Sequence, residues 1–62
     1  MKSNKDRVER KLQNINDAIG LAMDDFNNGN YKSAMDLVEE IMDDANYALR
    51  IMEENEEFQN SI

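Results

Sequence analysis

The side chains of this sequence that could take part in chemistry are nearly all carboxylates. Fourteen of the 62 residues are aspartate or glutamate, whereas histidine and cysteine are both absent. Spacings of three and four residues in the second half of the chain place six acids on the outer face of one expected helix. This acidic set consists of Asp36, Glu39, Glu40, Asp43, Asp44 and Glu54.

Three roles for the acidic set stay open. It could be a solvated face that keeps a small oligomer soluble, because like charges oppose aggregation. It could be a docking surface for a basic protein, with a charge pattern that mimics nucleic acid. It could also bind a divalent cation, since Mg²⁺ and Ca²⁺ prefer oxygen ligands. The chain has neither the loop spacing of an EF-hand nor the Glu-x-x-His pattern of a di-iron bundle, so we expect no metal and no cofactor.

Catalysis is not expected from the remaining side chains. Histidine, the commonest general base, and cysteine, the most reactive nucleophile, are both missing. The two glycines lie too far apart to form a phosphate-binding loop. Paired carboxylates can hydrolyse glycosides, but a short helical hairpin has no cleft that could enclose a sugar. We therefore predict that the protein is not an enzyme and has no catalytic residue.

Basic residues gather at the start of the chain. Residues 1–11 contain five basic and two acidic residues and are net +3, so the other 51 residues carry −10 of the total charge of −7. Four side chains here could contact nucleic acid, and they are Arg7, Arg10, Lys11 and Asn14. Because the rest of the chain repels phosphate, an RNA- or DNA-binding dimer is the alternative function and not the leading one.

The apolar residues predict the elements that position these charges. Two stretches show alternating spacings of three and four residues, the heptad pattern of packed helices. They contain Val8, Leu12, Ile15, Ile19, Ala22 and Phe26, and then Tyr31, Ala34, Val38, Ile41, Ala45, Ala48 and Met52. We predict helices over residues 4–27 and 31–57, no strands, and one domain over residues 1–62 in which the tail, 58–62, frays.

The link between the helices predicts how they are arranged. Gly29 suits the left-handed conformation that ends a helix, and Asn30 suits the N-cap of the next one. Ser3 or Asn4 can cap the first helix. A link this short makes the helices antiparallel neighbours, so the fold class is an all-α, antiparallel two-helix hairpin. The register should bring Phe26 to Tyr31 and Ile19 to Val38. It also places the basic start of the chain beside residues 53–57, where four glutamates lie.

The second helix is apolar over a wider arc than one neighbour needs. At 100° per residue, its apolar side chains cover about 160°, whereas one helix contact needs about 100° or less. A chain this short, without disulfides, rarely buries enough apolar surface alone. We therefore expect a homodimer that forms a four-helix bundle, with a groove for a different protein as the alternative. The expected oligomer interface consists of Leu37, Ile41, Ala48, Met52, Ala18 and Leu21. The sequence neither supports nor excludes a small ligand between protomers.

Three resemblances to known proteins support a helical hairpin with an interaction role. The segment Gly29-Asn30-Tyr31-Lys32-Ser33-Ala34 resembles the turn of a tetratricopeptide repeat, and Leu21 and Ala22 also fit that pattern. Asp25, Ile41 and Asn46 depart from it. The layout is similar to Rop-type plasmid copy-number regulators, which are hairpins that dimerise into four-helix bundles and bind RNA through their first helices. The small size, the acidity and the many asparagines are similar to those of phage-encoded inhibitors of host factors.

Together these observations predict a small non-enzymatic protein–protein interaction module. We expect a regulator or inhibitor, of the kind that phages and plasmids encode, that works in the cytoplasm of its own or a host cell. Its expected partners are a second copy of itself and a host or cognate protein with a basic surface, bound through the acidic set or an apolar groove. No apolar run is long enough to cross a membrane, so no membrane partner is expected.

Overall fold

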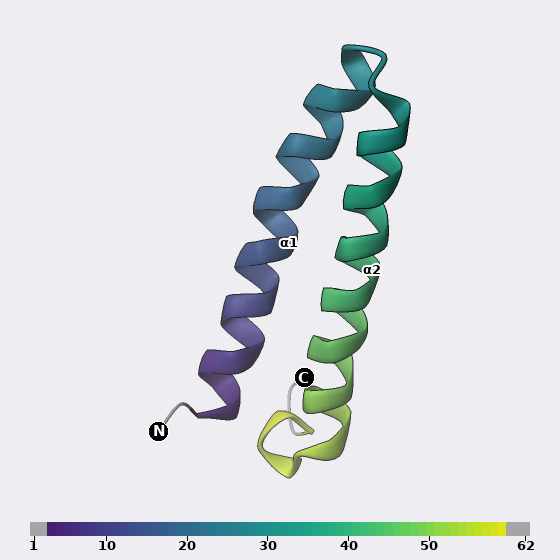
Figure 1. Cartoon of the computed structure of the whole chain (residues 1–62). Coiled ribbons are helices and arrows are strands. Elements are labelled where there is room, and N and C mark those ends of the chain that lie inside the picture. The colour runs from purple at the N-terminus through teal and green to yellow at the C-terminus, as the bar shows by residue number, and fades with distance from the viewer. Residues whose placement is uncertain (1–2, 60–62) are drawn as a thin grey trace.

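The computed structural model describes residues 3–59, and it shows two long helices side by side, joined at one end by a tight turn (Figure 1). Helix α1 spans Asn4–Asn27 and helix α2 spans Tyr31–Glu54. A short 3-10 helix, Glu56–Phe58, follows at the end of the hairpin opposite the turn. The long axis of the molecule measures 43 Å. Residues 3–59 contain no strand, so the predicted all-α antiparallel hairpin is confirmed.

Helix α1 begins at the predicted cap. Ser3 has an extended backbone, with φ −74° and ψ 166°, and its Oγ accepts a hydrogen bond of 3.1 Å from the backbone N–H of Asp6. This bond satisfies one of the backbone donors that a helix start leaves free. The negative charge of Asp6 in the first turn is also favourable beside the positive end of the helix dipole.

The turn between the helices depends on the backbone conformation of one glycine. Gly29 has φ +81°, a conformation that strains residues with a Cβ, and this lets the chain reverse after α1. The backbone N–H of Asn30 then donates to the carbonyl of Asp25 over 2.7 Å. Asn30 occupies the N-cap of α2 as predicted, but its side chain makes no capping bond. Instead, Ser33 Oγ lies 2.6 Å from Asp25 Oδ2 and joins the two helices across the turn.

The predicted end of the second helix is wrong by three residues, because α2 stops at Glu54 and not at residue 57. Asn55 takes an extended conformation, and its side-chain amide donates to the carbonyl of Ile51 over 2.8 Å. The amide of Gln59 donates to the carbonyls of Met52 and Glu53, at 2.7 and 3.1 Å. These amides occupy carbonyls that a helix end leaves unpaired.

The first two residues of the predicted tail belong to the 3-10 turn that follows α2, and the expected fraying stays a prediction. Phe58 is half-buried in the 3-10 turn, and Gln59 makes the capping bonds just described. Residues 60–62, the rest of the predicted tail, lie outside the described part of the chain.

The contact between the helices is lined by small side chains. Its buried residues are Val8, Ala18, Ala34 and Ala48, and Ala48 is only 2 % exposed. Residues 3–59 bury no side chain larger than valine. Because alanine occupies little space, the helix backbones approach each other closely. Larger apolar side chains such as Leu37, Ile41 and Met52 are half-buried in this contact, and others lie beside it and remain exposed.

Candidate functional site

One side of the hairpin carries a continuous set of large apolar side chains that water still reaches. Each of these residues is between 46 and 62 % exposed. The set is called the apolar face, and it consists of Leu12, Ile19, Met23 and Phe26 from α1 and Tyr31, Met35, Val38, Met42 and Leu49 from α2. Members seven residues apart, such as Leu12, Ile19 and Phe26, repeat along one side of a helix. The face therefore runs along most of the hairpin.

The apolar face is hollowed near the turn. One shallow depression lies between Ile19, Met23 and Phe26 of α1 and Ala34, Val38 and Ile41 of α2. A second, adjoining one is lined by Phe26, Tyr31, Met35 and Val38, with Glu39 as its one charged residue. Phe26 and Tyr31 pack edge to face with their ring centroids 5.3 Å apart, which confirms the predicted contact beside the turn.

The opposite side of the helix contact is called the polar face. Its depression is lined by Lys11, Asn14, Asp17, Ala18, Leu21, Leu37, Glu40 and Asp44. Lys11 Nζ lies 3.3 Å from Asp44 Oδ1 and 4.8 Å from the centre of the Tyr47 ring. The Lys11 and Asp44 side chains are only 30 and 21 % exposed, so this ion pair is screened less by water than a free surface pair.

Five members of the acidic set are exposed along α2, and Asp44 is the exception. Asp44 turns toward α1 and pairs with Lys11, while Glu39 borders the apolar face. Glu40 lines the depression of the polar face. Asp36, Asp43 and Glu54 are exposed, and Asp36 lies 3.7 Å from Lys32 one turn earlier. Within residues 3–59, no three acidic side chains are grouped so that they could hold a metal ion.

The residues expected at an oligomer interface lie mostly between the two helices of one chain. Ala18 and Ala48 are buried there, and Leu37, Ile41 and Met52 are half-buried. Only Leu21 is well exposed, and it borders the depression of the polar face. Conversely, Ile19 and Val38, which we expected to be covered within the hairpin, are about half exposed on the apolar face.

The positions of the alanines are the signal in the sequence that could have located the apolar face. Ala34 and Ala48 are two heptads apart, and they mark the side of α2 that approaches α1 most closely. Larger apolar side chains that neighbour these alanines on the surface of α2, such as Val38, therefore point away from the helix contact and toward the apolar face. Size, and not only apolar character, decides which part of a wide apolar arc faces the neighbouring helix.

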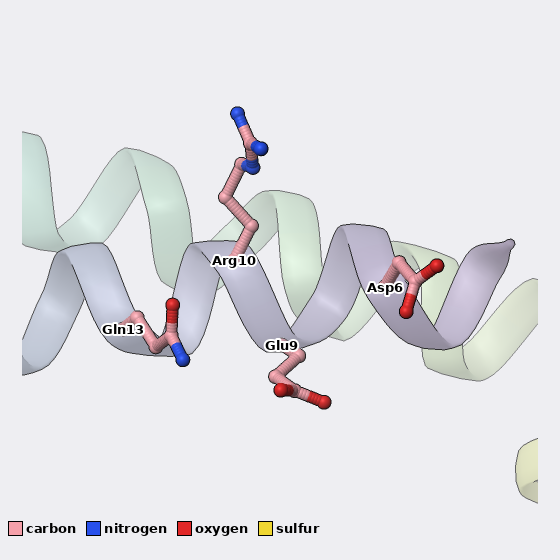
Figure 2. Close-up of a pocket in the computed structure, with 4 residues that line it drawn as sticks. All are labelled: Asp6, Glu9, Arg10 and Gln13. Carbon is pink, nitrogen blue, oxygen red and sulfur yellow. The ribbon is translucent and has the colours of Figure 1, made fainter. Parts of the chain in front are cut away.

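The predicted nucleic-acid patch is divided. Arg7, Arg10 and Asn14 are exposed, but Lys11 is held by Asp44 and Tyr47 on the polar face. Figure 2 shows Arg10 beside Asp6, Glu9 and Gln13 on α1, with their side chains pointing in different directions from one helix. Two carboxylates thus lie next to Arg10, which weakens the attraction of this surface for phosphate.

The ends of the hairpin lie beside each other as expected, but they are not joined by charge. The amide of Asn4 donates to Glu57 Oε1 over 3.0 Å. Within the described part of the chain, no lysine or arginine comes within 4.0 Å of a carboxylate of residues 53–57. Any attraction between the basic start of the chain and residues 53–57 is therefore a longer-range electrostatic one, without a direct ion pair among the described residues.

Comparisons with known proteins give no relative: no family model, no curated protein and no solved structure matches the chain. No helix in residues 3–59 is both long enough and apolar enough to cross a membrane.

Proposed function

We propose that this chain is a small, non-enzymatic protein–protein interaction module that docks through its apolar face. The observation that carries the proposal is the concentration of nine half-exposed large apolar side chains on one side of the hairpin. At roughly 200 Å² for a fully exposed aromatic side chain and about 100 Å² for an aliphatic one, they present on the order of 600 Å² of apolar surface. The largest apolar patch on an ordinary monomer is about 300–600 Å² and is itself often functional, so the apolar face lies at the upper end of that range.

The shape and charge of the apolar face favour a protein over other ligands. Its depressions are open and broad, whereas small molecules bind in concave sites that enclose most of their surface. Helices that lie on membranes carry lysine and arginine beside their apolar side, where they attract anionic lipids. Here the charged residue that borders the depressions is Glu39, and the whole chain is net −7.

The exposed members of the acidic set support a second contact, with a basic surface. Asp36, Glu40, Asp43 and Glu54 face solvent away from the depressions of the apolar face. A regulator or inhibitor could use one side to assemble and the other to meet its target in the cytoplasm. Asp36→Lys with Asp43→Lys should abolish such a contact and leave the Lys11–Asp44 pair intact, whereas Glu9→Lys should preserve it. Retention of a captured target by the double variant would contradict this second contact.

Site-specific photocrosslinking tests the docking function of the apolar face. Phe26 is replaced by the photoreactive residue p-benzoylphenylalanine, and the matched control carries it at Asn14 on the polar face. Both positions are exposed, so the probes differ in side and not in access. After irradiation in the producing cell, we expect protein adducts from position 26 and at least about tenfold fewer from position 14. Absence of adducts at position 26, or equal yields at the two positions, would overturn the proposal.

A further inference from the structure

We infer that the surface covering the apolar face is a second copy of this chain, so that two hairpins pack face to face as a four-helix bundle. The inference rests on the proposed docking function and names its partner. It follows from the area of the face, its width, its charge and the small core beneath it.

The area matches what a stable dimer needs. A standard protein–protein interface buries about 800 Å² on each partner. In homodimers about 65 % of such an interface, or roughly 520 Å², is apolar. The nine side chains of the apolar face present on the order of 600 Å² at exposures of 46 to 62 %. Two such faces therefore supply an interface of ordinary size without any rearrangement of the hairpin.

The apolar face is two helices wide, and this favours a partner of the same width. Ile19, Met23 and Phe26 line its depressions from α1, while Met35 and Val38 line them from α2. A single amphipathic helix would fill the groove between α1 and α2 but leave the outer side chains in water. A second hairpin covers both rows, and its own exposed side chains are of the same kind.

The charges of the chain do not oppose this pairing. The depression lined by Ile19, Met23 and Val38 contains no charged residue, and the neighbouring one contains only Glu39. Asp17, Glu40 and Asp44 line the polar face, so they would point away from a second copy. The net charge of −7 is therefore compatible with self-association, whereas a strongly basic partner would find few acids on the apolar face.

Because the core is small, the folded hairpin is best stabilised by a partner that is always present with the chain. The buried residues of the described chain are one valine and three alanines, which is little for a domain of this size. If the hairpin depended on the product of another gene, its apolar face would stay in water whenever the chain was made alone. A second copy is supplied by the same synthesis, and its binding stabilises the folded form by mass action.

Sedimentation equilibrium and thermal unfolding test the inference. We expect a mass twice the chain's 7.2 kDa at about 50 µM and a melting temperature that rises between about 5 and 500 µM, as for any dimer that unfolds to monomers. Val38 lines both depressions and is 47 % exposed, so Val38→Lys should raise the dissociation constant at least about 100-fold. The matched control, Leu21→Lys, alters an equally exposed side chain on the polar face and should leave the dissociation constant unchanged.

The thermal measurement on the unaltered chain keeps the test decisive if Val38→Lys does not fold. A folded 7.2 kDa monomer with a melting temperature independent of concentration overturns the inference. A dimer that Val38→Lys leaves intact overturns it too, because the contact then lies elsewhere. If the chain is monomeric but the photoreactive residue at position 26 joins it to a different protein, the docking function stands and the second copy does not. If neither association nor adducts occur, both fail.

Discussion

The apolar face and the polar face differ in whether their side chains are satisfied within one chain. On the polar face, Lys11 finds both the carboxylate of Asp44 and the ring of Tyr47 in its own hairpin. On the apolar face, nine large side chains remain about half exposed, and they have little more to pack against inside the chain. The polar face leaves two large apolar side chains, Leu21 and Tyr47, about half exposed, whereas the nine of the apolar face together gain far more free energy when another surface covers them.

The alanines of the helix contact separate these two faces. Ala18, Ala34 and Ala48 are buried between α1 and α2, and their small size fixes how the helices are rotated. That rotation sends the heptad residues Ile19 and Val38 to one side and Lys11 to the other. Changes at the contact should therefore affect both faces together, and changes on one face should spare the other.

The largest effect is expected from filling the contact itself. Ala48→Leu would push the helices apart, because Ala48 is 2 % exposed and has no space for three more carbon atoms. We expect a loss of about 3 kcal/mol in the free energy of unfolding, measured by urea denaturation followed by circular dichroism. Arg50→Leu is the control at an exposed position two residues later, and it should cost less than about 0.5 kcal/mol. Equal losses would show that Ala48 does not set the helix spacing.

A direct comparison of the two faces comes from residues of similar exposure. Met23 on the apolar face is 61 % exposed and Leu21 on the polar face is 57 % exposed. Met23→Ser should weaken self-association about tenfold, since it removes apolar area from the proposed interface. Leu21→Ser should leave association unchanged in the same sedimentation experiment. A larger effect at position 21 would assign the docking function to the polar face.

The ion pair of the polar face tests how far this face is stabilised within one chain. Lys11→Met removes the partner of the half-buried Asp44 and should cost about 1 kcal/mol of the free energy of unfolding. Lys32→Met breaks a pair whose lysine side chain is 88 % exposed, and it should cost less than about 0.5 kcal/mol. The cost at position 11 should shrink in 1 M salt, because salt screens the pair. A cost that salt does not change would assign the contribution of Lys11 to packing.

An effect no larger than that of the ion pair is expected at the glycine of α1, which lies outside both depressions. A Cβ added at Gly20 meets no atom within 4 Å, so Gly20→Ala should stabilise the chain by about 1 kcal/mol in thermal unfolding. Gly29→Ala provides the contrast, because its φ of +81° strains any residue with a Cβ and should lower stability by about 1 kcal/mol. If Gly20→Ala instead weakens self-association, the interface extends beyond the apolar face as defined.

Much of the fold could be predicted because it depends on local chemistry. The cap at Ser3, the reversal at Gly29 and the contact of Phe26 with Tyr31 each follow from residue type and spacing, and the structure contains all three. The end of α2 was misplaced because the capping donors, Asn55 and Gln59, lie among glutamates that have high helix propensity. The bonds that stop the helix depend on geometry that a propensity does not contain.

The candidate site was harder to predict, because it depends on the rotation of two helices by a fraction of a turn. The heptad spacing specifies an apolar stripe on each helix, but the stripe on α2 is wide enough to contact two neighbouring helices. The heptad spacing predicts that Val38 faces α1 and that Leu37 faces outward, whereas in the structure Leu37 is the more buried of the two. Likewise, Lys11 was assigned to an exposed patch, and its burial beside Asp44 depends on the same rotation.

The hydrogen bond between Asn4 and Glu57 has a consequence for how the hairpin can be joined to other proteins. It holds the first residue of α1 beside the 3-10 turn that follows α2, opposite the turn at Gly29 (Figure 1). The described chain thus leaves the molecule close to where it enters. Such a hairpin can be inserted into a surface loop of a carrier protein without stretching the carrier's backbone, and it would project its turn and both faces outward from the point of insertion.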